Sequence, residues 1–147
     1  ICSGFAAPLM LRQNRGLIIN ITAWVDDVYL ANIYYDTAKN AINRMAFGMA
    51  QELKKHNIAP VCLARGFIRT ERVVAAFDGA GMKGYESFTE SPEYVGRAVA
   101  ALAADPNVME KSGRVLTAGD LAREYGFTDV DGRLIPPFKL PDDYPYK

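Results

Sequence analysis

The spacing of hydrophobic positions changes several times along the chain and predicts alternating strands and helices. Residues 17–23 and 58–64 are near-continuous apolar runs, the first of them rich in β-branched side chains, as in strands buried on both faces of a parallel sheet. Pro60 lies in the second run and counts against a fully hydrogen-bonded central position there. A third, shorter strand is expected at residues 113–118.

Apolar residues at helical spacing lie between these runs. Residues 36–56 are predicted to form a long helix, and shorter helices are expected at 71–77 and at 119–125, the last of them closed by Gly126. Ser91-Pro92-Glu93 predicts the start of another helix. Serine caps helix N-termini, proline fits the first turn, and glutamate is favoured at the positive end of the helix dipole. This helix should end by residue 105. Residues 5–12 resemble the middle of a helix. The resulting order of elements predicts an α/β fold with a parallel sheet.

Composition and charge narrow the classes of protein. The 147 residues are enough for one domain, and 17 basic against 17 acidic residues give no net charge, which argues against a nucleic-acid partner. No apolar run is long enough to cross a membrane and no signal-peptide pattern opens the chain, so no membrane partner is expected. Cys2 and Cys62 have no metal-ligand spacing, so we expect no metal site and a reducing, cytoplasmic setting.

Tyr35 and Lys39 are the strongest candidates for chemistry. Residues four apart on a helix share a face, so the Lys39 ammonium can lie close to the Tyr35 ring and hydroxyl. A nearby cation favours the phenolate of a tyrosine, which suits that hydroxyl to exchange a proton with a carbonyl or alcohol oxygen. The pair lies on the stripe predicted to face the core: Tyr35, Lys39, Ile42, Ala46, Met49 and Leu53.

These features together resemble the short-chain dehydrogenases/reductases. The resemblance is carried by an apolar strand ending in Thr22, Tyr35-x-x-x-Lys39 with an alanine-rich helix, residues 66–70 after the next strand, and the segment 112–119. It covers nearly the whole chain but only the C-terminal half of a family member. It implies a Rossmann-like, doubly wound parallel sheet, of which this chain supplies about three strands with flanking helices.

The resemblance also implies an activity and its residues. Tyr35 would be the catalytic acid/base, Lys39 would promote its ionisation and hold the nicotinamide ribose, and Thr22 would orient the substrate oxygen. Gly66, Ile68 and Thr70 would lie along the nicotinamide end of an NAD or NADP cofactor. The expected reaction interconverts a small-molecule carbonyl and an alcohol by hydride transfer. Family members associate as dimers or tetramers, so a homo-oligomer is also expected.

Two positions depart from the family pattern. The family has two serines where this chain has Thr22-Ala23; counting from the strand places the catalytic position at Ala23, whereas counting back thirteen residues from Tyr35 places it at Thr22. Threonine still offers a hydroxyl for the role. Arg65 stands where the family usually has proline, and we hypothesise that it alters cofactor affinity, either by loosening the turn or by reaching a phosphate.

One family motif is missing. The dinucleotide is normally held by a glycine-rich turn between a first strand and a helix. Residues 79–84 satisfy G-x-G-x-x-G, but they follow a predicted helix rather than a strand, which favours a flexible loop. The family resemblance implies that this loop covers the substrate. We therefore interpret residues 1–147 as one segment, the C-terminal half of a Rossmann-type domain, with an extended proline-rich surface tail at 129–147. Such a segment is expected to fold well only with its other half.

Two other interpretations stay open. The chain could be a catalytically silent oligomerisation or interaction module, because a second face of the long helix carries only Ala38, Ala41, Met45 and Gly48. Sugar-nucleotide epimerases share the tyrosine and lysine, although Ala118-Gly-Asp-Leu favours the dehydrogenases. The sequence specifies neither the substrate nor the choice between NAD and NADP.

Overall fold

The computed structural model describes residues 2–23, 28–30 and 32–139 of the chain. Its sheet has three parallel strands in the order β1 (Gly16–Ala23), β2 (Ile58–Arg65) and β3 (Val115–Thr117). The β1–β2 register runs from Gly16 opposite Ile58 to Ala23 opposite Arg65, so both strands end at the same edge. The predicted α/β fold with a parallel sheet is confirmed.

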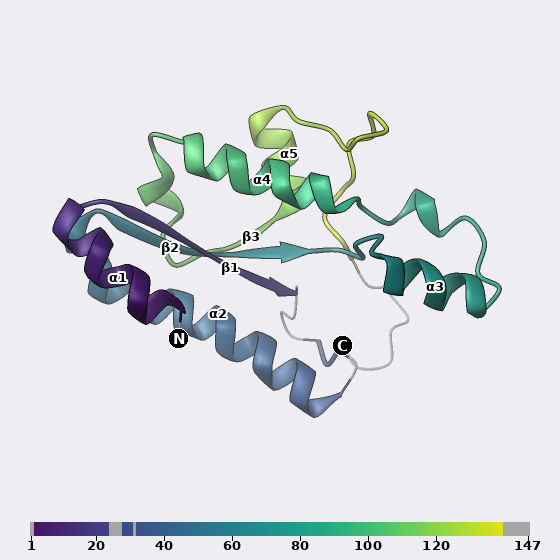
Figure 1. Cartoon of the computed structure of the whole chain (residues 1–147), viewed down its shortest axis with the longest axis horizontal. Helices are drawn as coiled ribbons and strands as arrows, with labels where there is room; N and C mark the ends of the chain where they lie inside the picture. Colours follow the sequence, from purple (N-terminus) through teal and green to yellow (C-terminus); the bar gives the residue numbers. More distant parts are fainter. Residues whose placement is uncertain (1, 24–27, 31, 140–147) are drawn as a thin grey trace.

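Helices cover both faces of this sheet (Figure 1). On one face lie α1 (Cys2–Gln13) and α2 (Ile33–Leu53), and on the other lie α4 (Pro92–Ala104) and α5 (Ala118–Tyr125). Helix α3 (Glu71–Gly79) stands beyond the carboxyl end of β2. The remaining elements are short 3₁₀ helices, η1 (Lys54–His56), η2 (Tyr85–Ser87) and η3 (Val108–Lys111).

Strand β2 is the central strand of the described sheet, but Pro60 does not occupy a fully hydrogen-bonded position in it. The N–H of Cys62 donates to the carbonyl of Arg114 on the β3 side, at 3.0 Å. Alternate residues of a strand direct their N–H groups to the same side, so the missing N–H of Pro60 belongs to the β3 side as well. Pairing with β3 begins only at Cys62. The proline therefore removes no hydrogen bond from the β1–β2 ladder.

The helix caps follow the local sequence. Ser91 caps α4 by accepting the N–H of Tyr94, and Gly126 closes α5 in the left-handed region, both as predicted. Helix α2 begins at Ile33, three residues earlier than predicted, because the side chain of Asn32 accepts the N–H of Tyr35 at 3.0 Å. Tyr35 therefore lies in the first turn of α2.

The core lies between the sheet and the α4–α5 layer. It contains the buried side chains of Val61, Leu63, Tyr94, Val95, Ala98, Leu102, Leu116, Leu121 and Ile135. Cys62 is fully buried, and burial raises the pKa of its thiol to about 11, as suits a packed rather than a reactive cysteine. Among the described residues, no helix is both long and apolar enough to span a membrane.

The segment after α5 is more than a surface tail. Residues 127–139 contain no helix or strand, yet Asp129 and Ile135 are buried, with 1% and 4% of their surface exposed. The hydroxyl of Tyr94 donates to the Ile135 carbonyl at 2.8 Å. Segment 127–139 is therefore packed against α4. Trp24, Asp26, Asp27, Asp142 and Asp143 lie outside the described residues.

Gly119 is the closest point between α5 and this segment. A Cβ at Gly119 would lie 2.4 Å from the backbone nitrogen of Pro137 and 2.8 Å from the Ile135 carbonyl oxygen. Because backbone rather than a mobile side chain occupies that space, we expect Gly119→Ala to lower the free energy of unfolding by about 1–3 kcal/mol in urea titrations. At Gly96 in α4 a Cβ meets nothing within 4 Å, so Gly96→Ala should be neutral or stabilising; equal losses would contradict this account.

Candidate functional site

Tyr35 and Lys39 lie together at the start of α2. The Lys39 Nζ is 5.5 Å from the centroid of the Tyr35 ring, within the range of a cation–π contact. Both side chains are partly exposed, so a ligand can reach them. The helical spacing predicted from the sequence therefore produces the expected pair.

The Lys39 ammonium also lies in the field of a second cation. Burial lowers the pKa of Lys39, and the positive charge of Arg65 lowers it further. Arg65 is the last residue of β2 and is paired in register with Ala23, the last residue of β1. The carboxyl ends of β1 and β2 thus meet the first two turns of α2, and in open α/β sheets ligands bind at this edge.

Thr22 lies beside α2 but its hydroxyl is engaged elsewhere. The side chain is fully buried, and its hydroxyl lies 3.4 Å from the Lys39 carbonyl and 3.3 Å from the Ala23 carbonyl. A hydroxyl has one proton, so it donates to one of these oxygens at a time. Within the described residues, Tyr35 is not among its hydrogen-bond partners. The structure therefore brings Thr22 close to the backbone of Lys39 without directing its hydroxyl at Tyr35.

Gly66, Ile68 and Thr70 form the loop that follows β2. All three are partly exposed. Thr70 caps α3, because its side chain accepts the N–H of Val73 at 3.4 Å, and its own N–H donates to the Ile68 carbonyl at 2.8 Å. Ile68 forms an isolated parallel bridge with Glu90. We call residues 66–70 the Gly66 loop.

The G-x-G-x-x-G segment lies in the context that argues against phosphate binding. Gly79 is the last residue of α3, and Gly81 and Gly84 adopt left-handed backbone conformations with φ of 66° and 74°. The segment thus joins a helix to the 3₁₀ helix η2, with no preceding strand to form a nucleotide-binding turn. The expectation of a loop at this position is confirmed.

Several aromatic side chains around the Gly66 loop pack into one cluster. The Phe77 ring centroid is 5.0 Å from that of Tyr85 and 6.2 Å from that of Phe88. Phe67 joins them, and Phe138 packs edge-on against Phe67 at 5.1 Å. Phe67 and Phe88 remain 42% and 45% exposed, so the cluster presents an apolar surface beside the Gly66 loop.

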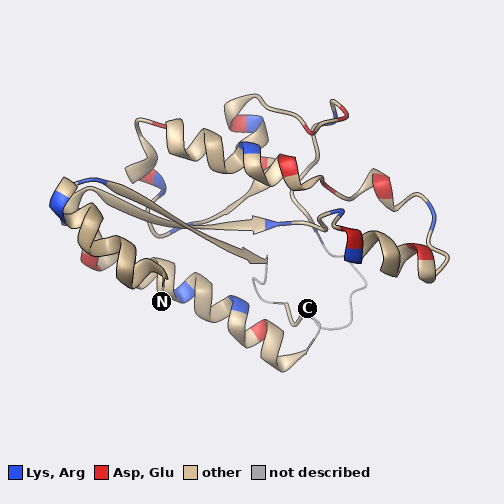
Figure 2. Cartoon of the chain, in the orientation of Figure 1, with Lys and Arg blue, Asp and Glu red and all other residues tan. Residues whose placement is uncertain are grey.

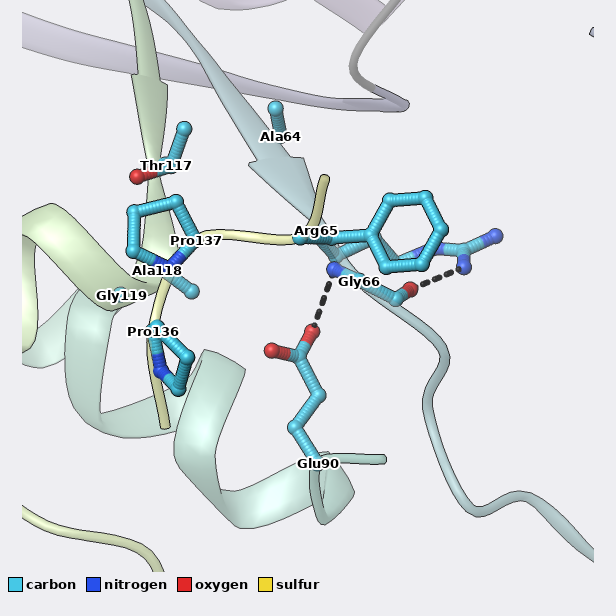
Figure 3. A pocket seen from close by; sticks show the side chains of 10 residues that line it. Ala64, Arg65, Gly66, Glu90, Thr117, Ala118, Gly119, Pro136 and Pro137 are labelled. Carbon is cyan, nitrogen blue, oxygen red and sulfur yellow. Dashed lines mark hydrogen bonds between the residues drawn. The ribbon is translucent and has the colours of Figure 1, made fainter. Parts of the chain in front are cut away.

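Glu90 is a site residue that the sequence did not indicate. Its side chain is 3% exposed and accepts the N–H of Gly66 at 2.9 Å (Figure 3). It lines a small pocket, open to solvent, together with the ends of β2 and β3 and with residues 136–138. A single glutamate before a helix carries no distinctive sequence signal, because its partner lies 24 residues away.

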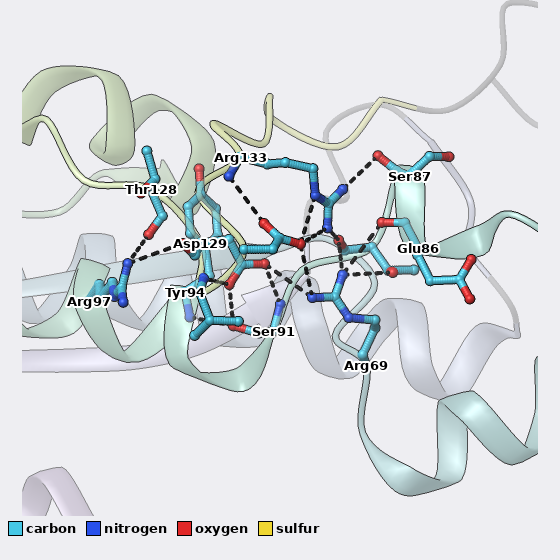
Figure 4. A network of polar contacts seen from close by, with 12 residues as sticks. Arg69, Glu86, Ser87, Ser91, Tyr94, Arg97, Thr128, Asp129 and Arg133 are labelled. Carbon is cyan, nitrogen blue, oxygen red and sulfur yellow. Dashed lines mark hydrogen bonds and ion pairs between the residues drawn. The ribbon is translucent and has the colours of Figure 1, made fainter.

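A polar network holds the other side of the Gly66 loop (Figure 4). Arg69 donates to the Thr89 carbonyl at 2.7 Å and forms an ion pair with the buried Asp129 at 3.4 Å. Asp129 also accepts the N–H of Ser91 at 3.0 Å and the hydroxyl of Ser91. Burial by itself raises the pKa of Asp129, but these hydrogen bonds and the charge of Arg69 outweigh it, so the pKa lies below its ordinary value.

Comparison with known proteins identifies the class to which this fold and site belong. The model of the short chain dehydrogenase family matches residues 1–80, so the chain belongs to that family. Dehydrogenase/reductase SDR family member 1 of Mus musculus is 39% identical over an alignment of 142 residues that covers 90% of this chain and 45% of the relative. The chain thus spans about half the length of the curated relatives it matches.

Solved structures share the fold. ElxO with NADP bound superposes with a TM-score of 0.68 at 22% identity, over 80% of this chain and 50% of ElxO. Acetoin dehydrogenase YohF from Salmonella typhimurium gives a TM-score of 0.63 at 28% identity, over 79% of this chain and 46% of that protein. The Rossmann-like architecture predicted from the sequence, present in part, is confirmed.

Proposed function

We propose that this chain supplies the catalytic half of an NAD(P)-dependent oxidoreductase that interconverts a carbonyl and an alcohol. The observation that carries the proposal is the Lys39 ammonium, 5.5 Å from the Tyr35 ring at the carboxyl edge of a parallel sheet. Family membership and the NADP named for ElxO support the cofactor class. The choice between NAD and NADP is left open, as is the substrate.

The residues at this edge fit a nicotinamide dinucleotide. Lys39 offers a partly exposed ammonium that can hold ribose hydroxyls, beside the hydroxyl of Tyr35. The Gly66 loop offers backbone groups at the end of β2, where Gly66 has no side chain to block a close approach. Gly66, Ile68 and Thr70 would therefore hold the nicotinamide end. When bound, the cofactor accepts or donates the hydride.

The proton would move at the Tyr35 hydroxyl. Tyr35 would give its proton to the substrate oxygen during reduction and take it back during oxidation. Thr22 would position the substrate oxygen, for which its hydroxyl must turn from the Lys39 carbonyl; Ala23, at the alternative position, brings no hydroxyl. The exposed aromatic cluster beside the Gly66 loop offers a wall for an apolar substrate.

We also propose that residues 1–147 are the C-terminal half of one Rossmann-type domain. Within the described residues, β1 pairs with β2 alone, which leaves its other edge open. Ile21 on that strand is 41% exposed. An open strand edge beside apolar surface favours pairing with a further strand. The other half of such a domain would supply that strand and the turn that binds the pyrophosphate.

A homo-oligomer is the partner that the exposed helix surface favours. Ala38 and Ala41 of α2 are exposed, and Met45 on the same face is 55% exposed. Small and apolar side chains allow close helix packing. Figure 2 shows Lys, Arg, Asp and Glu interspersed along the described helices and strands rather than gathered by sign. The same face would serve the alternative function, a catalytically silent interaction module.

Cofactor titration of the full-length polypeptide that contains this chain tests the proposal. We expect the intrinsic fluorescence of this polypeptide to be quenched on addition of NADPH or NADH, with micromolar affinity. The polypeptide should also oxidise one of these cofactors in the presence of carbonyl substrates. The isolated chain of 16.2 kDa is expected to bind neither, because its open sheet edge lacks a partner. A full-length protein that binds neither cofactor would exclude the oxidoreductase and leave the interaction module.

A further inference from the structure

The peptide groups of Gly66 are held by two side chains instead of by the sheet. Its N–H donates to the Glu90 carboxylate at 2.9 Å, and its carbonyl accepts from the Arg65 guanidinium at 3.1 Å (Figure 3). There is little free space around the turn, because a Cβ on Gly66 would lie 3.3 Å from the Cβ of Phe138 and 3.6 Å from a Glu90 oxygen. The hydrogen bond from Glu90 and the hydrogen bond from Arg65 can each be removed by substituting that side chain, without altering strand β2.

Glu90 also holds the next part of the loop through its backbone. Its N–H donates to the Phe67 carbonyl at 2.9 Å, and its carbonyl accepts the N–H of Arg69 at 2.8 Å. This is the bridge that places Glu90 opposite Ile68. One residue thus fixes the loop at Gly66, Phe67 and Arg69, with a buried carboxylate as the contact at the turn itself.

We infer that Glu90 and Arg65 are positioning residues for the cofactor. They hold the Gly66 turn in its binding conformation through hydrogen bonds to the N–H and the carbonyl of Gly66. The inference rests on the proposed function, because it concerns the same cofactor site. It goes further in assigning a role to a buried carboxylate that does not touch the reacting atoms. Arg65 then acts at the turn directly, rather than by loosening it or by reaching a phosphate.

The charge on Glu90 makes its hydrogen bond to the Gly66 N–H sensitive to pH. Burial raises the pKa of Glu90 to about 7, although the Gly66 N–H, Arg65 and Arg69 favour the ionised form; Asp129 opposes ionisation. Above that pH the carboxylate is charged and makes the stronger, charge-assisted bond to the Gly66 N–H. Below that pH, the neutral carboxylic acid makes a weaker hydrogen bond to the Gly66 N–H. Tyr94 on α4 is another titratable group in its field, and burial raises its pKa above its ordinary value.

Cofactor dissociation constants of Glu90→Gln, measured in the full-length protein with NADPH and NADH, test the inference. We expect Glu90→Gln to weaken binding about tenfold at pH 8 and to remove the loss of affinity that the wild type shows between pH 8 and pH 6. Arg65→Met should weaken binding as well, and the double variant should lose less than the product of the two effects, because both act on one turn. The control is Glu93→Gln, an exposed change in the first turn of α4.

Two measurements made without cofactor distinguish this positioning role from a general destabilisation of the fold. Amide exchange of residues 65–70 should accelerate in Glu90→Gln and not in Glu93→Gln. The melting temperature of Glu90→Gln at pH 8 should equal or exceed that of the wild type, because the raised pKa means that ionising Glu90 disfavours folding as the pH rises from about 4.5 to about 7. Unchanged affinity in the Glu90 and Arg65 variants of a cofactor-binding wild type overturns this inference alone. A wild type that binds no cofactor overturns the proposed function and this inference with it.

Discussion

Replacing Tyr35 by phenylalanine in the full-length protein should abolish measurable turnover while leaving cofactor binding nearly unchanged. General acid–base catalysis by one positioned group contributes about a hundredfold to ten-thousandfold to rate, so kcat should fall by at least about a hundredfold. The ring itself remains, and with it the cation–π contact that holds Lys39 at 5.5 Å. Stopped-flow or steady-state oxidation of NAD(P)H, with a parallel cofactor titration, measures both quantities.

The neighbouring tyrosine provides the matched control. Tyr34 lies in the same helical turn but is 85% exposed, so its hydroxyl is solvated and Tyr34→Phe should keep full activity. Both variants should unfold within about 0.5 kcal/mol of the wild type, since neither creates a cavity. If Tyr35→Phe kept more than a tenth of wild-type turnover, the acid/base role assigned to Tyr35 would be wrong.

Replacing Asp129 by alanine should cause the largest loss of stability among the substitutions considered. The Asp129 carboxylate is buried and accepts from Ser91, from the Val130 N–H at 2.7 Å and from Arg69. Removing one partner of a buried ion pair leaves the others without an acceptor, which costs about 3–5 kcal/mol. That is a large share of the stability of an ordinary domain. Urea unfolding of the full-length protein at pH 7 measures the loss.

The pH dependence of this loss follows from the lowered pKa of Asp129. A carboxyl whose pKa is lower in the folded state stabilises the fold above its ordinary pKa, near 4, and loses that contribution as the pH falls further. The difference between wild type and Asp129→Ala should therefore be constant from pH 5 to 8 and shrink in acid. Asp131→Ala is the control, because that side chain is 40% exposed and should matter much less. Equal losses for the two variants would refute the role of the buried carboxylate.

The Asp129 prediction and the Glu90 inference concern one structural arrangement. The Gly66 loop is held from two sides, by Glu90 at its first residue and by the network of Arg69 and Asp129 at its end. Asp129 belongs to segment 127–139, which also brings Phe138 against Phe67. The part of the chain expected to be a surface tail therefore contributes to the proposed cofactor site.

The elements and the pairing of Tyr35 with Lys39 could be predicted because their causes are local. Apolar runs of strand length, Ser91 and Gly126 at helix ends, and the four-residue spacing of Tyr35 and Lys39 depend on neighbours within a few positions. Helix α2 begins three residues before the predicted start because the side chain of Asn32 caps it. That signal was also local and was available in the sequence.

The sequence by itself determined the order of the elements, the family resemblance and the positions of Tyr35 and Lys39, because side chains a turn apart on a helix must share a face. Only the tertiary structure decided the centrality of β2 despite Pro60, the engagement of the Thr22 hydroxyl, and the contacts of Glu90 with Gly66 and of Asp129 with Arg69. The last two join residues 24 and 60 positions apart. Hydrophobic spacing indicates which face of a segment is buried, but it does not indicate which distant polar group will meet it there.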